Sequence, residues 1–172
     1  MRKQLLLAGL ILIGACSHIA PRTLFALRDL DPLTADPADI AVMIDVPDSV
    51  AVQRGTAILT FGARQDAGSQ IERNFVLARQ ANTFFVDQQD HADLAALQAR
   101  IKAWKDDDPD GTTGSISIHF QPCKTMPDIP DDLRGSVAIQ LEQDGPFLPL
   151  FTDAPLDALL SKESQETMEP CS

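Results

Sequence analysis

The chain has 172 residues and a formal net charge of −11, with 25 acidic residues against 14 lysines and arginines. A chain of this length forms one domain with an ordinary hydrophobic core. Its acidity excludes nucleic-acid binding as an expected function, because that binding depends on cationic side chains that neutralise phosphates.

The first residues carry the most specific pattern in the chain. Arg2 and Lys3 precede an apolar run from Leu5 to Ile13, and the small residues Gly14 and Ala15 follow. This is the layout of a secretory signal with its cleavage site. The run is too short to cross ~30 Å of hydrocarbon, which takes about 20 residues, so a transmembrane helix is not expected.

The residue after this site is a cysteine, and Ile13-Gly14-Ala15-Cys16 resembles the lipobox of bacterial lipoproteins. The resemblance implies that residues 1–15 are removed and that the sulfur of Cys16 receives a diacylglycerol, which anchors the protein in the membrane. Ser17 follows instead of the aspartate of inner-membrane lipoproteins, which implies the outer membrane, at its periplasmic face. The alternative is an ordinary secretory signal that leaves Cys16 as a free thiol.

The other two cysteines form the only internal pair that remains once Cys16 is lipidated. We expect a disulfide between Cys123 and Cys171, because an envelope compartment is oxidising. The rival interpretation is a metal or redox pair, but there is no Cys-x-x-Cys spacing. A disulfide would hold the polar C-terminal tail on the domain.

Residues 16–38 are expected to form a lipidated tether that ends draped on the body, followed by a single domain over residues 39–172. Apolar residues at every second position predict three half-buried strands. They are Ile40 to Val46, Ala57 to Phe61, which we expect to stop at Gly62, and Ile71 to Leu77. Short connections between them favour an antiparallel meander.

The period then changes from two to that of a helix. Leu94, Leu97, Ile101 and Trp104 recur at steps of three and four, which predicts an amphipathic helix with one apolar stripe. Asp90 is the expected N-cap. We expect this helix to lie across the sheet with Trp104 buried between the two.

Two more strands and a closing helix are predicted after it. Ile116, Ile118 and Phe120 are expected to point inward while Ser115, Ser117 and His119 point outward, and the alternation of Val137, Ile139 and Leu141 predicts the next strand. Phe147 to Phe151 reads as an edge segment because of its prolines, and a short helix is expected near Asp153 to Ser161, with Thr152 or Asp153 as its cap. The expected fold class is therefore α+β: an antiparallel β-sheet, in one layer or as a two-layered sandwich, with one main helix and a short C-terminal helix.

An acidic loop after the main helix is the sharpest motif for chemistry. Asp106, Asp108 and Asp110 fall at alternate positions before Gly111, which resembles the front half of an EF-hand calcium loop. The back half departs from the pattern, because Ser117 stands where a bidentate glutamate is expected. The alternative is a solvated acidic turn between helix and strand.

No catalytic signature is present in the sequence. A metal site from Asp87 and His91, four residues apart, is conceivable, but a solvated helix start is favoured over it. His119 could line a binding surface or simply face water. There is no Gly-x-Ser-x-Gly or Ser-x-x-Lys motif and no glycine-rich phosphate loop.

These patterns predict a membrane-anchored envelope lipoprotein that is not an enzyme and serves as an interaction or accessory module for an envelope protein partner. The alternative is a periplasmic module that binds a small ligand, or calcium through the loop Asp106 to Asp110. No other cofactor and no nucleic-acid partner are expected.

Overall fold

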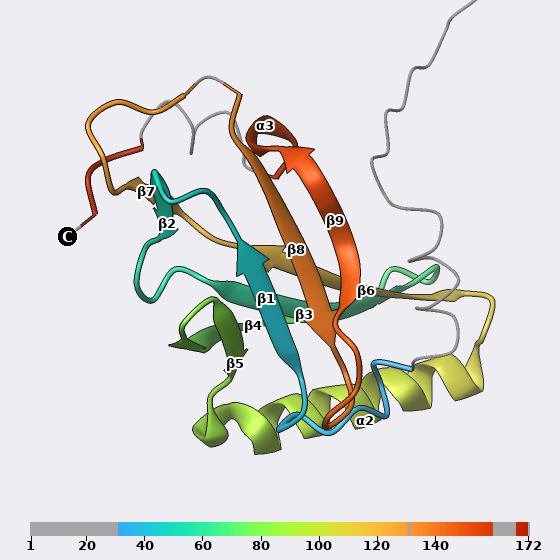
Figure 1. The fold of residues 1–172 in the computed structure, drawn as a ribbon. Helices are drawn as coiled ribbons and strands as arrows, with labels where there is room; N and C mark the ends of the chain where they lie inside the picture. Colours follow the sequence, from blue (N-terminus) through green and yellow to red (C-terminus); the bar gives the residue numbers. More distant parts are fainter. Residues whose placement is uncertain (1–30, 131, 160–167, 172) are drawn as a thin grey trace, which may run out of the picture.

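The computed structural model describes residues 31–130, 132–159 and 168–171, so Cys16 and the predicted signal lie outside the described residues. Seven strands form one antiparallel sheet in the order β6-β3-β4-β5-β1-β8-β9 (Figure 1). The bounds of these strands, in chain order, are β1 (Ala41–Asp45), β3 (Ile58–Gln65), β4 (Gln70–Gln80), β5 (Thr83–Val86), β6 (Thr112–His119), β8 (Arg134–Gln140) and β9 (Leu148–Pro155).

The remaining elements are short, apart from one helix. A two-stranded ribbon joins β2 (Val50–Val52) to β7 (Pro122–Lys124). The helical segments are η1 (Gln88–Asp90), the main helix α2 (His91–Asp107) and the single turn α3 (Leu156–Leu159). Among the described residues no helix is long and apolar enough to span a membrane.

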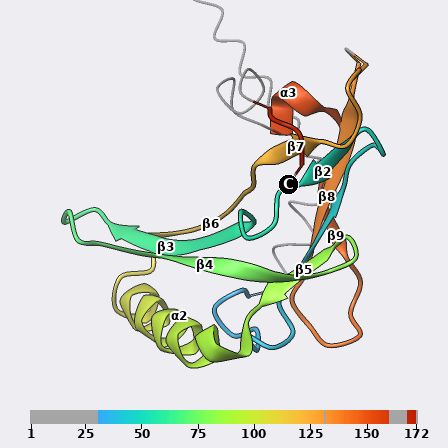
Figure 2. The ribbon, with the colours of Figure 1, turned by 90° about the vertical axis from the view of Figure 1, so that its left-hand side faces the viewer.

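The large sheet curls, so that its two halves lie at a steep angle and form a half-barrel (Figure 2). Its concave face carries the predicted alternating residues, which are buried in one continuous core. They include Ile40, Val42, Ile44, Leu59, Phe61, Phe75, Leu77, Val137, Ile139 and Leu141. The predicted strands and their apolar face are therefore confirmed, and the sheet is one curled layer rather than a sandwich. The expected meander was wrong for its first strand, because β1 pairs with β5 and β8 rather than with β3.

Gly62 does not end its strand as expected. Its pairing with Glu72 of β4 is so close that an added Cβ would lie 2.7 Å from the Ile71 carbonyl oxygen. Glycine here allows close approach of the neighbouring backbone, and β3 continues to Gln65. The chain then turns through residues 66–69 into β4, so that turn residues rather than Gly62 bound the strand.

The main helix packs on the concave face, where it contacts β3 and β6. Phe61 and Arg73 are register partners on that face, and Arg73 pairs with Asp93 of α2 at 2.9 Å. Leu94 and Ile101 are fully buried, which confirms the apolar stripe. Trp104 is only partly buried, so the expectation of full burial was wrong; the Arg100 guanidinium covers its ring at 5.6 Å.

Asp90 is the N-cap residue of this helix, as predicted, but its side chain makes no capping hydrogen bond. A 3₁₀ turn precedes the helix, and Asp87 caps that turn, where its carboxylate accepts from the Gln89 amide at 3.0 Å. In the continuous segment of 3₁₀ turn and α-helix, the first unpaired backbone amides are therefore capped three residues earlier than the sequence pattern suggested.

The C-terminal part is more extended than expected. Asp153 lies inside strand β9, which pairs only with β8, so the predicted edge segment is confirmed and its strand is longer. The predicted helix near Asp153 to Ser161 was wrong: one helical turn, Leu156–Leu159, follows the strand. The fold is consequently mostly antiparallel β with one main helix, a coarser outcome than the α+β class expected.

The predicted disulfide is confirmed. Cys123 and Cys171 are bonded, with their Cα atoms 4.9 Å apart. The end of the chain adds to the β2–β7 ribbon beside the bond, because Lys124 donates to the Glu169 carbonyl and Cys171 donates to the Lys124 carbonyl. The C-terminal residues are therefore attached to the body.

Candidate functional site

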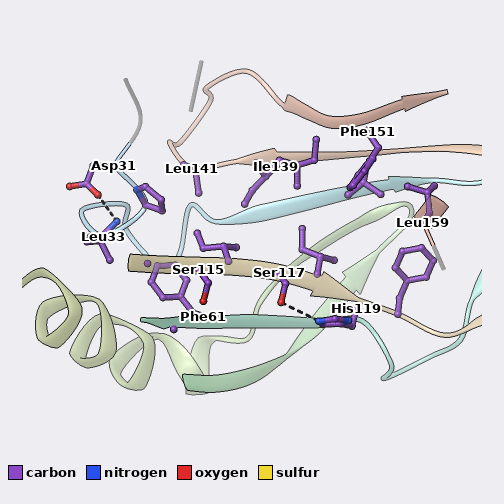
Figure 3. A pocket seen from close by; sticks show the side chains of 18 of the residues that line it. Asp31, Leu33, Phe61, Ser115, Ser117, His119, Ile139, Leu141, Phe151 and Leu159 are labelled. Carbon is purple, nitrogen blue, oxygen red and sulfur yellow. Dashed lines mark hydrogen bonds between the residues drawn. The ribbon is translucent and has the colours of Figure 1, made fainter. Parts of the chain in front are cut away.

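A cavity lies between the two edges of the curled sheet. Strands β6 and β9 stand at opposite ends of the strand order, and the curl brings them to face each other. The space between them has a volume of about 710 Å³ (Figure 3). This is within the range of about 300–1,000 Å³ typical of small-molecule sites. We call this cavity the slot.

Apolar side chains line the slot from both sides. On one side they come from β3, β6 and the residue after it: Phe61, Ile116, Ile118 and Phe120. On the other they come from β8, β9 and α3 with the residue after β8: Val137, Ile139, Leu141, Leu150, Phe151 and Leu159. In Figure 3, Ile139 and Phe151 lie across the slot from β6. The lining therefore suits an apolar ligand.

Burial differs between this part of the concave face and the rest. Leu59 and Phe61 on β3 are buried, whereas Ile116 and Ile118, their register partners on β6, are only partly buried. The pairing of β3 with β6 is regular, so the difference in burial between the two strands comes from what covers their side chains. The main helix packs over part of this face, and the slot lies over Ile116 and Ile118, while the buried Phe61 also lines the slot.

One end of the slot is polar. Asp31 and Lys105 line it, and Lys105 has no ion pair among the described residues. Gln98, a buried side chain of α2, donates to the carbonyl oxygens of Pro32 and Ala35 at 2.8 and 2.9 Å and so fixes the entering chain there. Residues 31–38 are thus held against the body.

A second, polar hollow adjoins this end. It shares Asp31 and Leu141 with the slot and has a volume of about 400 Å³. Its other lining residues are Thr34, Ala35, Asp36, Asp39 and Glu142. Four carboxylates therefore surround the polar end of the slot, against the single ammonium of Lys105.

The opposite end of the slot is apolar. Phe120 and Leu159 line the slot and also pack against a second buried cluster around Val50 and Leu156. Met168 packs against the same cluster, three residues before the disulfide-bonded Cys171. The disulfide therefore holds part of the packing behind this end.

Ser115, Ser117 and His119 lie on the other side of β6, as expected from the alternation (Figure 3). Ser117 Oγ and His119 Nε2 are hydrogen-bonded at 3.1 Å. Both side chains are exposed, and within the described residues no carboxylate bonds to His119. Ser117 and His119 are nevertheless among the residues that line the slot, so the pair adds a polar edge to its apolar lining.

The acidic loop holds its carboxylates apart. Asp106 pairs with Lys102 at 2.7 Å, and this hydrogen bond raises the pKa of Lys102 above 10.5. Asp108 accepts from the Gly111 amide at 2.9 Å. Asp110 is exposed at the following turn. Within the described part of the chain, no group of three or more acidic, histidine or cysteine side chains is placed to hold a metal ion. Calcium binding by this loop stays a prediction, and a melting temperature equal in calcium and in chelator would contradict it.

The other predicted metal pair also has separate partners. His91 Nε2 donates to the Val86 carbonyl at 3.1 Å, while Asp87 accepts from the Gln89 amide. The structure therefore brings together none of the sequence-predicted metal ligands. It brings together instead an apolar set from β6, β8 and β9 that the sequence marked only as core.

No protein-family model matches this chain, and neither a curated protein nor a solved structure is similar to it.

Proposed function

We propose that this protein is a lipid-anchored envelope module that binds an apolar small molecule in the slot and performs no chemistry on it. The observation that carries the proposal is the slot itself: about 710 Å³ lined mostly by apolar side chains on a regular sheet. Burying an apolar ligand there removes apolar surface from water on both partners, which is favourable by about 25 cal/mol per Å².

The predicted anchor supports the same function. A lipid on Cys16 would hold an acidic domain beside the membrane, where apolar molecules are concentrated. Acyl anchoring is firm when two or more chains insert. The expected partner is then an envelope protein that delivers the ligand or receives it. A Cys16→Ser form, exported but unlipidated, should leave the membrane fraction while keeping its fold.

The binding test uses a neutral apolar fluorophore, N-phenyl-1-naphthylamine, with the full Cys16→Ser chain. We expect a saturable increase in fluorescence. Ile118→Glu should abolish most of it, because a carboxylate in the slot must be desolvated whenever ligand enters. Thr113→Glu is the matched control: it places the same charge on the same strand, at an exposed residue that is not among those lining the slot.

The control should bind as the parent does, and both variants should melt as folded proteins. No saturable signal from the parent, or an equal loss in both variants, would contradict the proposed site.

A further inference from the structure

The shape of the slot restricts its ligand further, and this inference rests on the proposed function. Side chains of three alternate residues line it from β6 and its end, namely Ile116, Ile118 and Phe120. At about 3.3 Å per residue, Ile116 and Phe120 are ~13 Å apart along the strand, and the lining extends from there back to Gly114. On the facing side, Val137 to Leu141 covers a similar length. The slot is therefore elongated along the strands.

The two ends of this elongated cavity differ in polarity. Leu141 and Asp31 lie at one end and Phe151 and Leu159 at the other (Figure 3). The first end opens to Lys105 and the polar hollow, while the second is backed by the cluster around Val50. A long ligand with one polar end thus has a single favourable orientation.

Charge at the polar end restricts the polar group. Asp31, Asp36, Asp39 and Glu142 carry four carboxylates around it, and Lys105 is the one cation that lines it among the described residues. An anionic head would meet a net negative field, whereas a zwitterionic head can place its cation toward the carboxylates. Most of these side chains are exposed, so water and salt screen the effect and keep it modest.

We propose that the slot holds one long unbranched acyl chain of a lipid whose head has no net negative charge. The chain lies along β6, with its methyl end at Phe120 and Leu159 and its head at Asp31 and Lys105.

The test is native mass spectrometry and calorimetry on the exported, full Cys16→Ser chain, which carries no acyl chain of its own on that residue. The probes are lauroyl, myristoyl and palmitoyl lysophosphatidylcholine below their micelle-forming concentrations, with palmitate as the anionic ligand of equal chain length. We expect one lysolipid per protein. Affinity should rise about four-fold per added methylene, since each contributes about 0.8 kcal/mol when buried.

Two variants test where the acyl chain lies in the slot. Gly114 lies on the slot side of β6 and an added Cβ meets nothing within 4 Å, so Gly114→Phe fills the polar end without disturbing the strand. It should weaken the palmitoyl lysolipid about ten-fold or more, as should Ile118→Glu, because each removes the contacts of several methylenes. Thr113→Glu, at an exposed residue of β6 that does not line the slot, should leave binding unchanged.

Palmitate at low salt should bind about five-fold more weakly than the lysolipid, a modest factor because solvent screens exposed charges. The double variant Asp39→Asn, Glu142→Gln should narrow that difference, as both side chains line the polar hollow.

Each of the other possible outcomes would contradict a particular part of the proposal. If the neutral fluorophore binds in the slot and no lysolipid does, the acyl inference fails while the proposed function stands. If neither binds, both fail. Two lysolipids per protein, or affinity that does not change with chain length, would contradict a single chain along β6. Palmitate binding at least as tightly as the lysolipid would overturn the assignment of the head group.

Discussion

The two halves of the concave face are built from the same alternation and differ in what covers them. On one half, Leu94 and Ile101 of α2 pack against the sheet and are 0% exposed. Between β6 and β9 nothing comparable fills the space among the described residues, and Ile116 and Ile118 stay partly exposed. One half is therefore a packed core, and the other is a cavity with a complete apolar wall.

The difference teaches that an apolar stripe shows which face points inward but not whether that face is filled. Close packing is the norm in protein interiors, so an unfilled apolar wall is the informative exception. The two halves should therefore differ in how strongly truncation destabilises them and in how they respond to a ligand.

The largest expected effect comes from the bond behind the apolar end of the slot. Replacing both Cys123 and Cys171 by serine opens a loop with a sequence separation of 48 residues. In the chain-entropy model this costs up to about 4 kcal/mol of unfolding free energy. Denaturant unfolding of the Cys16→Ser chain with and without the pair measures it. An unchanged midpoint would show that the disulfide does not hold the native tail.

The packed half should respond more strongly to truncation than the slot. Leu94→Ala leaves a cavity under a fully buried side chain and should cost about 3 kcal/mol. Ile118→Ala removes a partly buried side chain beside existing empty space, so it should cost about 1 kcal/mol and weaken ligand binding instead. The two variants are compared by denaturant unfolding. Equal losses of stability would mean that the slot is packed as tightly as the core.

The smallest expected effect lies at the surface of α2, near the polar end of the slot. The hydrogen bond and charge of Asp106 raise the pKa of Lys102, with a weaker contribution from Asp31. The pKa of Lys102 is higher in the folded state than its unfolded value of 10.5. The Lys102–Asp106 pair therefore stabilises the fold below that value, and this stabilisation is lost as pH rises through the folded pKa.

An NMR titration of the Lys102 ammonium should give a pKa above 10.5, and Asp106→Asn should bring it back toward that value. Identical titrations in the two proteins would contradict the pairing.

The sequence alone predicts much of the local structure. The alternation of Ile40 to Val46 and the three-and-four spacing from Leu94 to Ile101 specify β1 and α2 because each pattern is set by near neighbours in the chain. Asp90 stands at the predicted N-cap position, but the capping hydrogen bond comes from Asp87, because a 3₁₀ turn that the sequence pattern did not reveal precedes the helix.

The slot could not be predicted in this way. It depends on β6 meeting β9 across the curl, and those strands are separated by β7 and β8 in the chain. Ile116 and Val137 carry the same signal whether a helix or a ligand covers them. Likewise, the loop carboxylates suggested a cation because their spacing is visible in sequence, while the hydrogen bonds of Asp106 and Asp108 to Lys102 and Gly111 are visible only in the fold.

The most direct test of the binding slot is methyl NMR of the isoleucines during titration with palmitoyl lysophosphatidylcholine. Ile116 and Ile118 line the slot and are only partly buried, whereas Ile40, Ile44 and Ile101 are buried in the core and are not among the lining residues. The account predicts saturable shifts in the first set and little change in the second. Shifts spread equally over both sets, or confined to the packed set, would contradict a ligand site between β6 and β9.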